Sequence, residues 1–224
     1  MHYFSKIVLH KSARTQQEFT DPGRGTQAIH RLIWRAFEDQ PGQERDFIFR
    51  VDVEDDAFVM WAVSKREPDD WGGRFTVDTK PYSPRIEVGQ QLGFELRVHP
   101  TVTSSSPGKQ RGKRHDAVMH YKAGLEPEVL ESMPQEALIE KAALAWMSGQ
   151  GARVGFEIQT LTTDSYVQRK FKKKPTSKHP VKLSILDLSG VLVVKDPDAL
   201  IGALTGGLGS AKAYGNGLFM LSPL

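Results

Sequence analysis

The chain has 224 residues, 39% of them hydrophobic and 25% charged, which describes a globular protein of one large domain or two domains of roughly 100 residues. No apolar run approaches the roughly 20 residues of a membrane span, the N-terminus shows no secretory-signal pattern, and the absence of cysteine excludes disulfides, thiolate metal sites and cysteine nucleophiles. The net charge is +3, and together these features predict a cytoplasmic protein.

The first part of the chain predicts one helix among strands. Residues 3–9 are rich in β-forming side chains and predict a strand. From Ile29 to Phe37, apolar residues repeat at i, i+3, i+4, i+7 and i+8, the spacing of one buried helical face. Residues 46–53 and 57–63 predict a hairpin, and the stretch 67–87 is rich in turn-forming proline and glycine.

The second part predicts a longer series of elements. Alternating apolar and polar residues predict a strand over 92–102. A helix is predicted with Ser132 as its cap, Pro134 in its first turn and Gly149 or Gly151 at its end. Two strands, a helix and a closing strand follow in chain order over residues 153–161, 182–194, 196–204 and 218–221.

The order of these elements is approximately β-α-β-β twice, with a helix and strand closing the second copy. This order predicts an α+β fold of two tandem ferredoxin-like (RRM-like) domains, an arrangement common in RNA-binding proteins. We place an N-terminal domain over residues 1–88 and a C-terminal domain over residues 89–224.

Two basic clusters lie in the second part of the chain. Residues 1–90 hold 13 basic and 15 acidic side chains, whereas residues 91–224 hold 17 basic and 12 acidic. The first cluster is Lys109, Arg111, Lys113 and Arg114, and the second is Arg169, Lys170, Lys172, Lys173, Lys174 and Lys178. Either alone is equally compatible with a solvated loop, but together they favour binding to the phosphates of a nucleic acid. The second cluster is expected at the projecting end of a β-hairpin, along an RNA stem.

His30 is the candidate catalytic residue. The seven histidines are scattered, without the spacing of a metal site. His30 lies one step off the apolar stripe, in the first turns of the first predicted helix, where the helix dipole and free amides favour a bound phosphate. The alternative is a histidine at the edge of the core whose ring is satisfied by a backbone carbonyl, and the residues themselves leave both open.

The acidic group Asp52, Glu54, Asp55 and Asp56 is the best candidate for a carboxylate metal site. Its place in a predicted hairpin turn, where aspartate bonds to the local backbone, favours a structural role. We therefore predict neither a metal nor another cofactor.

Residues 206–217 form a glycine-rich segment, the most distinctive motif of the chain. Its position near the C-terminus and its lack of a P-loop ending disfavour a nucleotide-using enzyme. Its bare backbone is suited to approach a phosphodiester chain closely, with Lys212 adding charge, and the alternative is a flexible terminal turn. The glycines assigned to RNA binding are Gly207, Gly209, Gly215 and Gly217.

This glycine pattern resembles the C-terminal loop of the CRISPR-associated RAMP-type RNA-binding proteins. Further segments resemble the CasE family, the endoribonucleases that process CRISPR RNA in type I-E systems. They are residues 4–9, His30 with Arg31, residues 45–50, residues 94–100, Gly112-Lys113-Arg114 and residues 218–224. The resemblance extends over nearly the whole chain, in the same order.

The resemblance implies two ferredoxin-like domains that cut the repeat stem-loop of precursor CRISPR RNA without a metal. It implies that His30 matches the family's catalytic histidine, with Gln27 where a tyrosine often stands. It also implies that the protein stays bound to the 3′ hairpin of the mature RNA. The other partners implied are the remaining subunits of a type I-E surveillance complex, with no membrane partner.

The composition agrees with this chemistry, because RNA carries its own nucleophile and the protein needs only a base, an acid and cations. The products expected are a 2′,3′-cyclic phosphate, or a 3′-phosphate, and a 5′-hydroxyl. The rival hypothesis is a non-catalytic RAMP-type RNA-binding subunit of a CRISPR effector complex.

Overall fold

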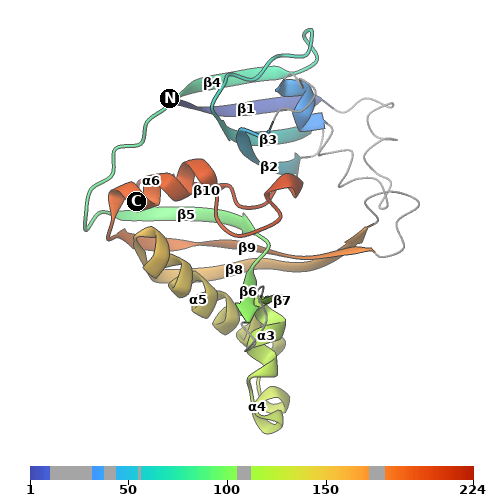
Figure 1. The fold of residues 1–224 in the computed structure, drawn as a ribbon, viewed down its shortest axis with the longest axis vertical. Coiled ribbons are helices and arrows are strands. Elements are labelled where there is room, and N and C mark those ends of the chain that lie inside the picture. The colour runs from blue at the N-terminus through green and yellow to red at the C-terminus, as the bar shows by residue number, and fades with distance from the viewer. Residues whose placement is uncertain (11–31, 38–43, 55–56, 105–111, 172–179) are drawn as a thin grey trace.

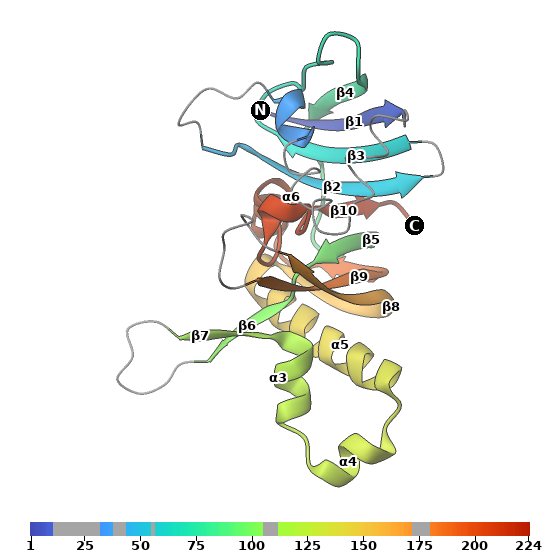
Figure 2. The ribbon, with the colours of Figure 1, turned by 90° about the vertical axis from the view of Figure 1, so that its right-hand side faces the viewer.

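The computed structural model describes residues 1–10, 32–37, 44–54, 57–104, 112–171 and 180–224. These residues form two four-stranded antiparallel sheets, one above the other in Figure 1, with most of the helices below the second sheet and α6 (Pro197–Gly206) above it. A small two-stranded hairpin projects from the side of the second sheet, as Figure 2 shows. None of the helices in the described part of the chain is long and apolar enough to span a membrane.

The first sheet has the strand order β2-β3-β1-β4. Its strands are β1 (His2–His10), β2 (Phe47–Glu54), β3 (Ala57–Ser64) and β4 (Thr76–Tyr82). Residues 32–36 are helical and bury the apolar face predicted from the sequence. The ring of Phe37 stacks on that of Phe47 of β2 with 4.4 Å between centroids, so aromatic contacts hold this helix on the sheet.

The second sheet has the order β10-β5-β9-β8. Its strands are β5 (Gln91–Val98), β8 (Phe156–Phe171), β9 (Val181–Val194) and β10 (Phe219–Ser222). Two helices, α5 (Gln135–Val154) and α6 (Pro197–Gly206), contribute Met147 and Leu200 to the same buried core as these strands.

Both sheets follow one topology. In each, the first strand along the chain lies between the third and the fourth, and the second strand lies outside the third. This is the ferredoxin-like strand order, so the predicted fold class is confirmed. The strands of the first sheet fall within residues 2–82 and those of the second within residues 91–222. The domain boundary between residues 88 and 89 stays a prediction.

The second unit carries an insertion between β5 and β8. It consists of the hairpin β6 (Thr101–Ser104) and β7 (Lys113–Asp116), followed by the helices α3 (Ala117–Ala123) and α4 (Pro127–Ser132). Neither short helix was predicted from the sequence. The Asp116 side chain caps α3 by accepting a hydrogen bond from the Met119 amide.

Several predicted element boundaries were wrong. The turn-rich stretch 67–87 contains β4, an edge strand whose exposed face is polar and whose position tolerates Pro81. Ser132 ends α4 and does not cap the following helix, because Pro134 takes the N-cap position of α5. β8 continues ten residues past the predicted end at Leu161, because β9 pairs with it along its whole length.

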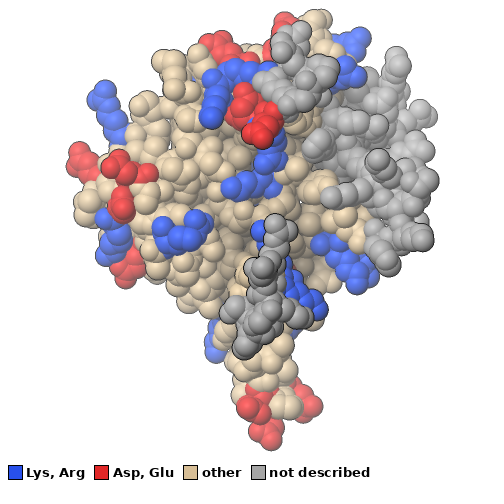
Figure 3. Space-filling view, viewed as in Figure 1, with Lys and Arg blue, Asp and Glu red and all other residues tan. Residues whose placement is uncertain are grey.

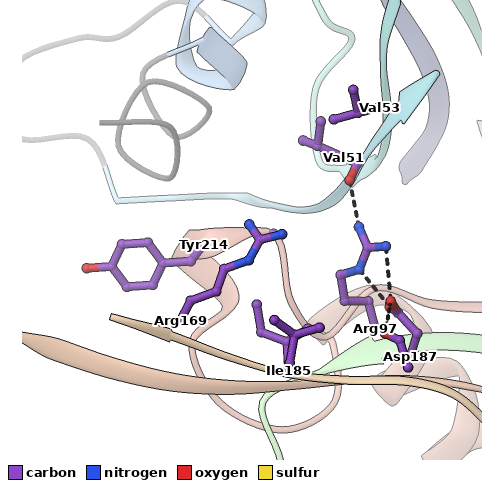
Figure 4. Close-up of a pocket in the computed structure, with 10 residues that line it drawn as sticks. Val51, Val53, Arg97, Arg169, Ile185, Asp187 and Tyr214 are labelled. Atoms are coloured by element: carbon purple, nitrogen blue, oxygen red, sulfur yellow. Dashed lines mark hydrogen bonds and ion pairs between the residues drawn. The ribbon is translucent and has the colours of Figure 1, made fainter. Parts of the chain in front are cut away.

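The two sheets contact each other through an ion-pair network centred on Arg97 of β5. Its guanidinium binds the Asp187 carboxylate of β9 at 2.7 and 3.3 Å, donates 2.6 Å to the Val51 carbonyl of β2, and pairs with Asp52 at 3.2 Å. Arg50 of β2 extends the network, with contacts of 2.9 Å to Asp52 and 3.1 Å to Glu95 of β5. Figure 4 shows Arg97 reaching from the second sheet to the backbone of β2.

Asp187 is held in its ionised form by this network. Burial by itself would raise the pKa of Asp187, but hydrogen bonds and charge attraction from Arg97, with a hydrogen bond from Ser165, lower it below its ordinary value. A lowered pKa in the folded state means that ionised Asp187 stabilises the fold at neutral pH.

We expect Asp187→Asn to lower the free energy of unfolding by about 1.5–3 kcal/mol at pH 7, the range for hydrogen bonds to charged groups. This loss should stay constant above about pH 5. It should shrink as pH falls below about 3.9, the ordinary aspartate pKa, because Asp187 then takes up a proton in the unfolded chain while it stays ionised in the folded protein. Urea unfolding from pH 7 to pH 3 measures both. Asp78→Asn, at an exposed position of β4, is the control and should change little. An equal loss at every pH would contradict the ionic explanation.

Candidate nucleic-acid interface

A groove of about 580 Å³ lies beside the second sheet, where β7, β8, β9 and the glycine-rich segment meet. Four basic side chains line it: Arg114, Arg169, Lys170 and Lys182. We call this the basic groove. The fold therefore brings a member of the first predicted cluster, Arg114, together with the two described members of the second, although many residues separate them in the chain.

Strand pairing explains the density of charge in the basic groove. Arg169 and Lys170 end β8, Lys182 begins β9, and Lys170 lies directly opposite Lys182 in the register of the two strands. Like charges at this spacing repel each other, so a bound polyanion would stabilise the arrangement. The sequence analysis missed Lys182. Its position at the start of the strand that follows the second basic cluster could have indicated it.

Charge is divided over the surface of the molecule. Figure 3 shows Lys and Arg side chains around the middle of the view, acidic and basic side chains together at its top and left, and acidic side chains alone at the projecting tip. That tip is α4 with its flanking residue, where Glu126, Glu128 and Glu131 are exposed. Such a division orients an approaching polyanion toward the sheet and away from the tip.

Histidines line the basic groove without forming a metal site. The Nδ1 atom of His99 lies 2.7 Å from the Ser184 carbonyl, so this ring is bonded to the backbone. His115 and His120 pack against each other with 6.0 Å between ring centroids. Among the described residues, no group of three or more His, Asp or Glu side chains is placed to hold a metal ion.

Several predicted site residues lie outside the described residues. They are His30, Lys109, Arg111, Lys172, Lys173, Lys174 and Lys178, together with Asp55 and Asp56 of the acidic group. Lys113 is described and is exposed on β7. Asp52, the acidic residue considered as a metal ligand, forms ion pairs with Arg50 and Arg97, which supports the structural role.

The glycine-rich segment is packed against the body of the protein. The Leu208 amide donates to the Gly217 carbonyl at 2.9 Å, and the Gly217 amide donates to the Arg97 carbonyl at 2.7 Å. Asn216 is fully buried, and its amide nitrogen bonds to two carbonyls of the segment. The alternative of a flexible terminal turn is therefore wrong.

Packing against the protein itself explains the glycines. At Gly217, φ is +92° and an added Cβ would lie 2.5 Å from the Leu208 carbonyl oxygen. At Gly209, φ is +75° and a Cβ would lie 2.5 Å from the Val98 side chain. Gly207 and Gly215 face Ile48 and Phe49 of the first sheet. The segment thus fits between the two sheets because it lacks side chains at these positions.

Lys212 lies in the short helix η1 (Lys212–Tyr214) of this segment. Its Nζ donates 2.7 Å to the carbonyl of Gly206, where α6 ends, a favourable place for a cation. Burial lowers the pKa of Lys212, and repulsion from Arg45 and Arg153 lowers it further. Lys212 therefore holds the segment onto α6 in addition to carrying charge.

We expect Gly217→Ala to lower the free energy of unfolding by about 2–4 kcal/mol, because a Cβ there meets both an unfavourable φ and the Leu208 carbonyl. Gly202→Ala is the matched control, since it lies in α6 with no atom within 4 Å of an added Cβ and should stabilise by up to about 1 kcal/mol. Urea unfolding monitored by tryptophan fluorescence measures both. A Gly217→Ala variant as stable as the parent would contradict this, because it would mean that the segment shifts to accommodate the added Cβ at no cost in stability.

Comparisons with known proteins agree with this architecture. The chain is 25% identical to the "CRISPR system Cascade subunit CasE" of Escherichia coli K12, over 99% of this chain and 100% of that protein. It is 23% identical to the "CRISPR-associated endoribonuclease Cse3" of Thermus thermophilus, over 99% and 100%.

Two solved structures share the fold. CRISPR endoribonuclease Cse3 bound to a 19 nt RNA superposes with a TM-score of 0.69 and 22% identity, covering 99% of both chains. Cas6e from Escherichia coli K-12 superposes with a TM-score of 0.63 and 23% identity, covering 99% of this chain and 100% of that one. The sequence model of the family described as CRISPR associated protein matches residues 2–223, and the chain belongs to that family.

Proposed function

We propose that this chain is a metal-independent endoribonuclease that binds the repeat stem-loop of precursor CRISPR RNA and cleaves it at the 3′ base of the stem. The observation that carries the proposal is the basic groove beside the second sheet, which is lined by Arg114, Arg169, Lys170 and Lys182. Full-length similarity to proteins named CasE and Cse3 supports the choice of a CRISPR RNA as the substrate.

The basic groove suits a duplex stem held by its phosphates. Side chains do not easily read the deep major groove of A-form RNA, so charge and shape must supply most of the affinity. The second basic cluster, of which Arg169 and Lys170 are described, continues from the end of β8 and is proposed to follow the stem. Lys113, Arg114 and the remainder of the first cluster are proposed to contact it from the hairpin of β6 and β7.

His30 is proposed as the general base, or as the acid for the departing 5′-oxygen. The 2′-hydroxyl of the nucleotide before the scissile bond attacks the phosphorus, the P–O5′ bond breaks, and the products are a 2′,3′-cyclic phosphate and a 5′-hydroxyl. Nearby cations stabilise the charge on the phosphorane as it forms. This reaction needs no metal ion, because the nucleophile is part of the substrate.

Retention of the product follows from the same surface. An RNA held by several neutralised phosphates binds tightly at moderate salt. We therefore propose that the protein stays on the 3′ hairpin of the mature RNA. The CasE relative is named as a subunit of Cascade, which supports assembly of this chain into a type I-E surveillance complex. We place this assembly in the cytoplasm.

Cleavage of a repeat RNA should proceed undiminished in excess EDTA and should stop when the scissile nucleotide carries a 2′-deoxy sugar. His30→Ala should lower the single-turnover rate by at least about a hundredfold, the lower range for general acid–base catalysis, while the Kd stays within about twofold. Gel analysis of end-labelled RNA measures the rate. Dependence on added magnesium would contradict the mechanism. A wild-type protein that binds the repeat but never cuts it would establish the non-catalytic subunit instead.

Neutralising Lys170 and Lys182 together, by Lys→Gln at both positions, should flatten the slope of log K against log salt by about 1.4–1.8, since each phosphate contact contributes about 0.7–0.9. The single-turnover rate at saturating protein should change little. Fluorescence anisotropy at several salt concentrations measures the slope. The control replaces Lys141 of α5 and Lys195, both exposed and remote from the start of β9. An unchanged slope for the Lys170 and Lys182 variant would place the RNA elsewhere.

A further inference from the structure

A second cavity, of about 250 Å³, lies between the two sheets and adjoins the basic groove. We call it the intersheet cavity. Val51 and Val53 of β2 form its upper wall in Figure 4, and Ile185 of β9 forms its floor. Tyr214 and Arg169 stand at one side, and Arg97 with Asp187 at the other. No residue on the upper wall carries a charge.

The apolar walls of the intersheet cavity are unusually exposed. Val53 is 63% exposed and Val167, which also lines the cavity from β8, is 45% exposed. They come from different sheets, so each sheet offers a branched apolar side chain to the same space. A flat apolar ligand lying between them would remove both from water, which favours binding.

Tyr214 and Arg169 supply planar groups beside these walls. The Tyr214 ring packs edge to face against Phe171 with 5.1 Å between centroids, which fixes its orientation. In Figure 4 the Arg169 guanidinium rises from β8 toward β2, between Tyr214 and Arg97. Proteins that bind single-stranded RNA stack unpaired bases on such aromatic rings and guanidinium planes.

The far end of the intersheet cavity disfavours a phosphate. Asp187 remains ionised there, since it accepts hydrogen bonds from Arg97 and from Ser165 at 2.8 Å. The Arg97 charge is already shared between Asp187 and Asp52. A phosphate would therefore meet a carboxylate without a free cation from Arg97. An exocyclic amino group or ring N–H of a base would instead find an acceptor.

We infer that the intersheet cavity binds one unpaired nucleobase of the RNA, next to the stem that occupies the basic groove. This inference rests on the proposed function. The volume lies below the range of about 300–1,000 Å³ for drug-sized ligands, so it suits a single base and not a base pair. Arg169 lines both the cavity and the groove, and its guanidinium points toward the cavity, so the two sites meet at this residue.

Abasic substitution tests the inference. A repeat RNA with a 2′-deoxy sugar at the scissile position is prepared with a single abasic site at each unpaired nucleotide flanking the stem. At one of these positions, loss of the base should weaken wild-type binding by roughly fivefold to a hundredfold, the range for one stacked base. Fluorescence anisotropy measures each Kd.

The variant Val167→Trp fills the cavity from β8 and should weaken binding of the intact RNA by a similar factor. In this variant the abasic penalty should disappear, because the base no longer has a place to bind. Val53→Trp fills the same cavity from the other sheet and should give the same result. Val88→Trp is the matched control, since Val88 is 69% exposed and lies outside the cavity, and it should retain the wild-type penalty.

A direct readout uses the wild-type protein. The base analogue 2-aminopurine, placed at the sensitive position, should lose fluorescence on binding as it stacks. The inference is wrong if no unpaired position shows a penalty, if the penalty persists in a folded tryptophan variant, or if 2-aminopurine stays unquenched. Cleavage of the repeat by the wild-type protein tests the proposed function separately, so either idea can fail without the other.

Discussion

The Arg97 guanidinium is the point at which the two sheets and the glycine-rich segment are joined. Its side chain binds Asp187 of its own sheet and the Val51 carbonyl and Asp52 of the other. Its main-chain carbonyl accepts the Gly217 amide. Partial burial keeps water from competing for these bonds, so the geometry of one residue positions three elements. The intersheet cavity lies beside this contact, and a buried apolar cluster of Ile48, Val63 and Leu218 also joins the two sheets.

The glycine-rich segment owes its sequence to packing as much as to any ligand. An added Cβ would lie 2.5 Å from protein atoms at Gly209 and Gly217, and 3.0–3.3 Å from them at Gly207 and Gly215, with Val98 in one sheet and Phe49 in the other among the residues met. The segment thereby closes the space between the sheets and carries Tyr214 to the edge of the intersheet cavity. Because this backbone is already ordered, it would lose little conformational entropy on binding a ligand.

Basic and acidic side chains are concentrated in different parts of the molecule. Basic side chains converge where β8 and β9 begin their pairing, whereas the acidic tip at α4 projects away from the sheets. The ion pairs of Arg50, Arg97 and Asp187 lie where the two sheets meet, and each cation there is matched by a carboxylate. In the proposed complex, phosphates lie in the basic groove and the apolar walls of the intersheet cavity accept a base.

Local patterns in the sequence determined the elements with regular periodicity. The apolar stripe before Phe37, the β2–β3 hairpin and the start of α6 at Asp196 follow from neighbouring residues, as do the charged clusters and the glycine motif. Tertiary structure decided the rest, because the deciding partners are distant in the chain. β4 is a strand only because β1 pairs with it, and Lys182 joins the site only through its register with β8. Asp52 connects the two sheets only because β5 brings Arg97 beside it. The spacing of apolar residues indicates which face of a helix or strand is buried, but it does not indicate which other element packs against that face.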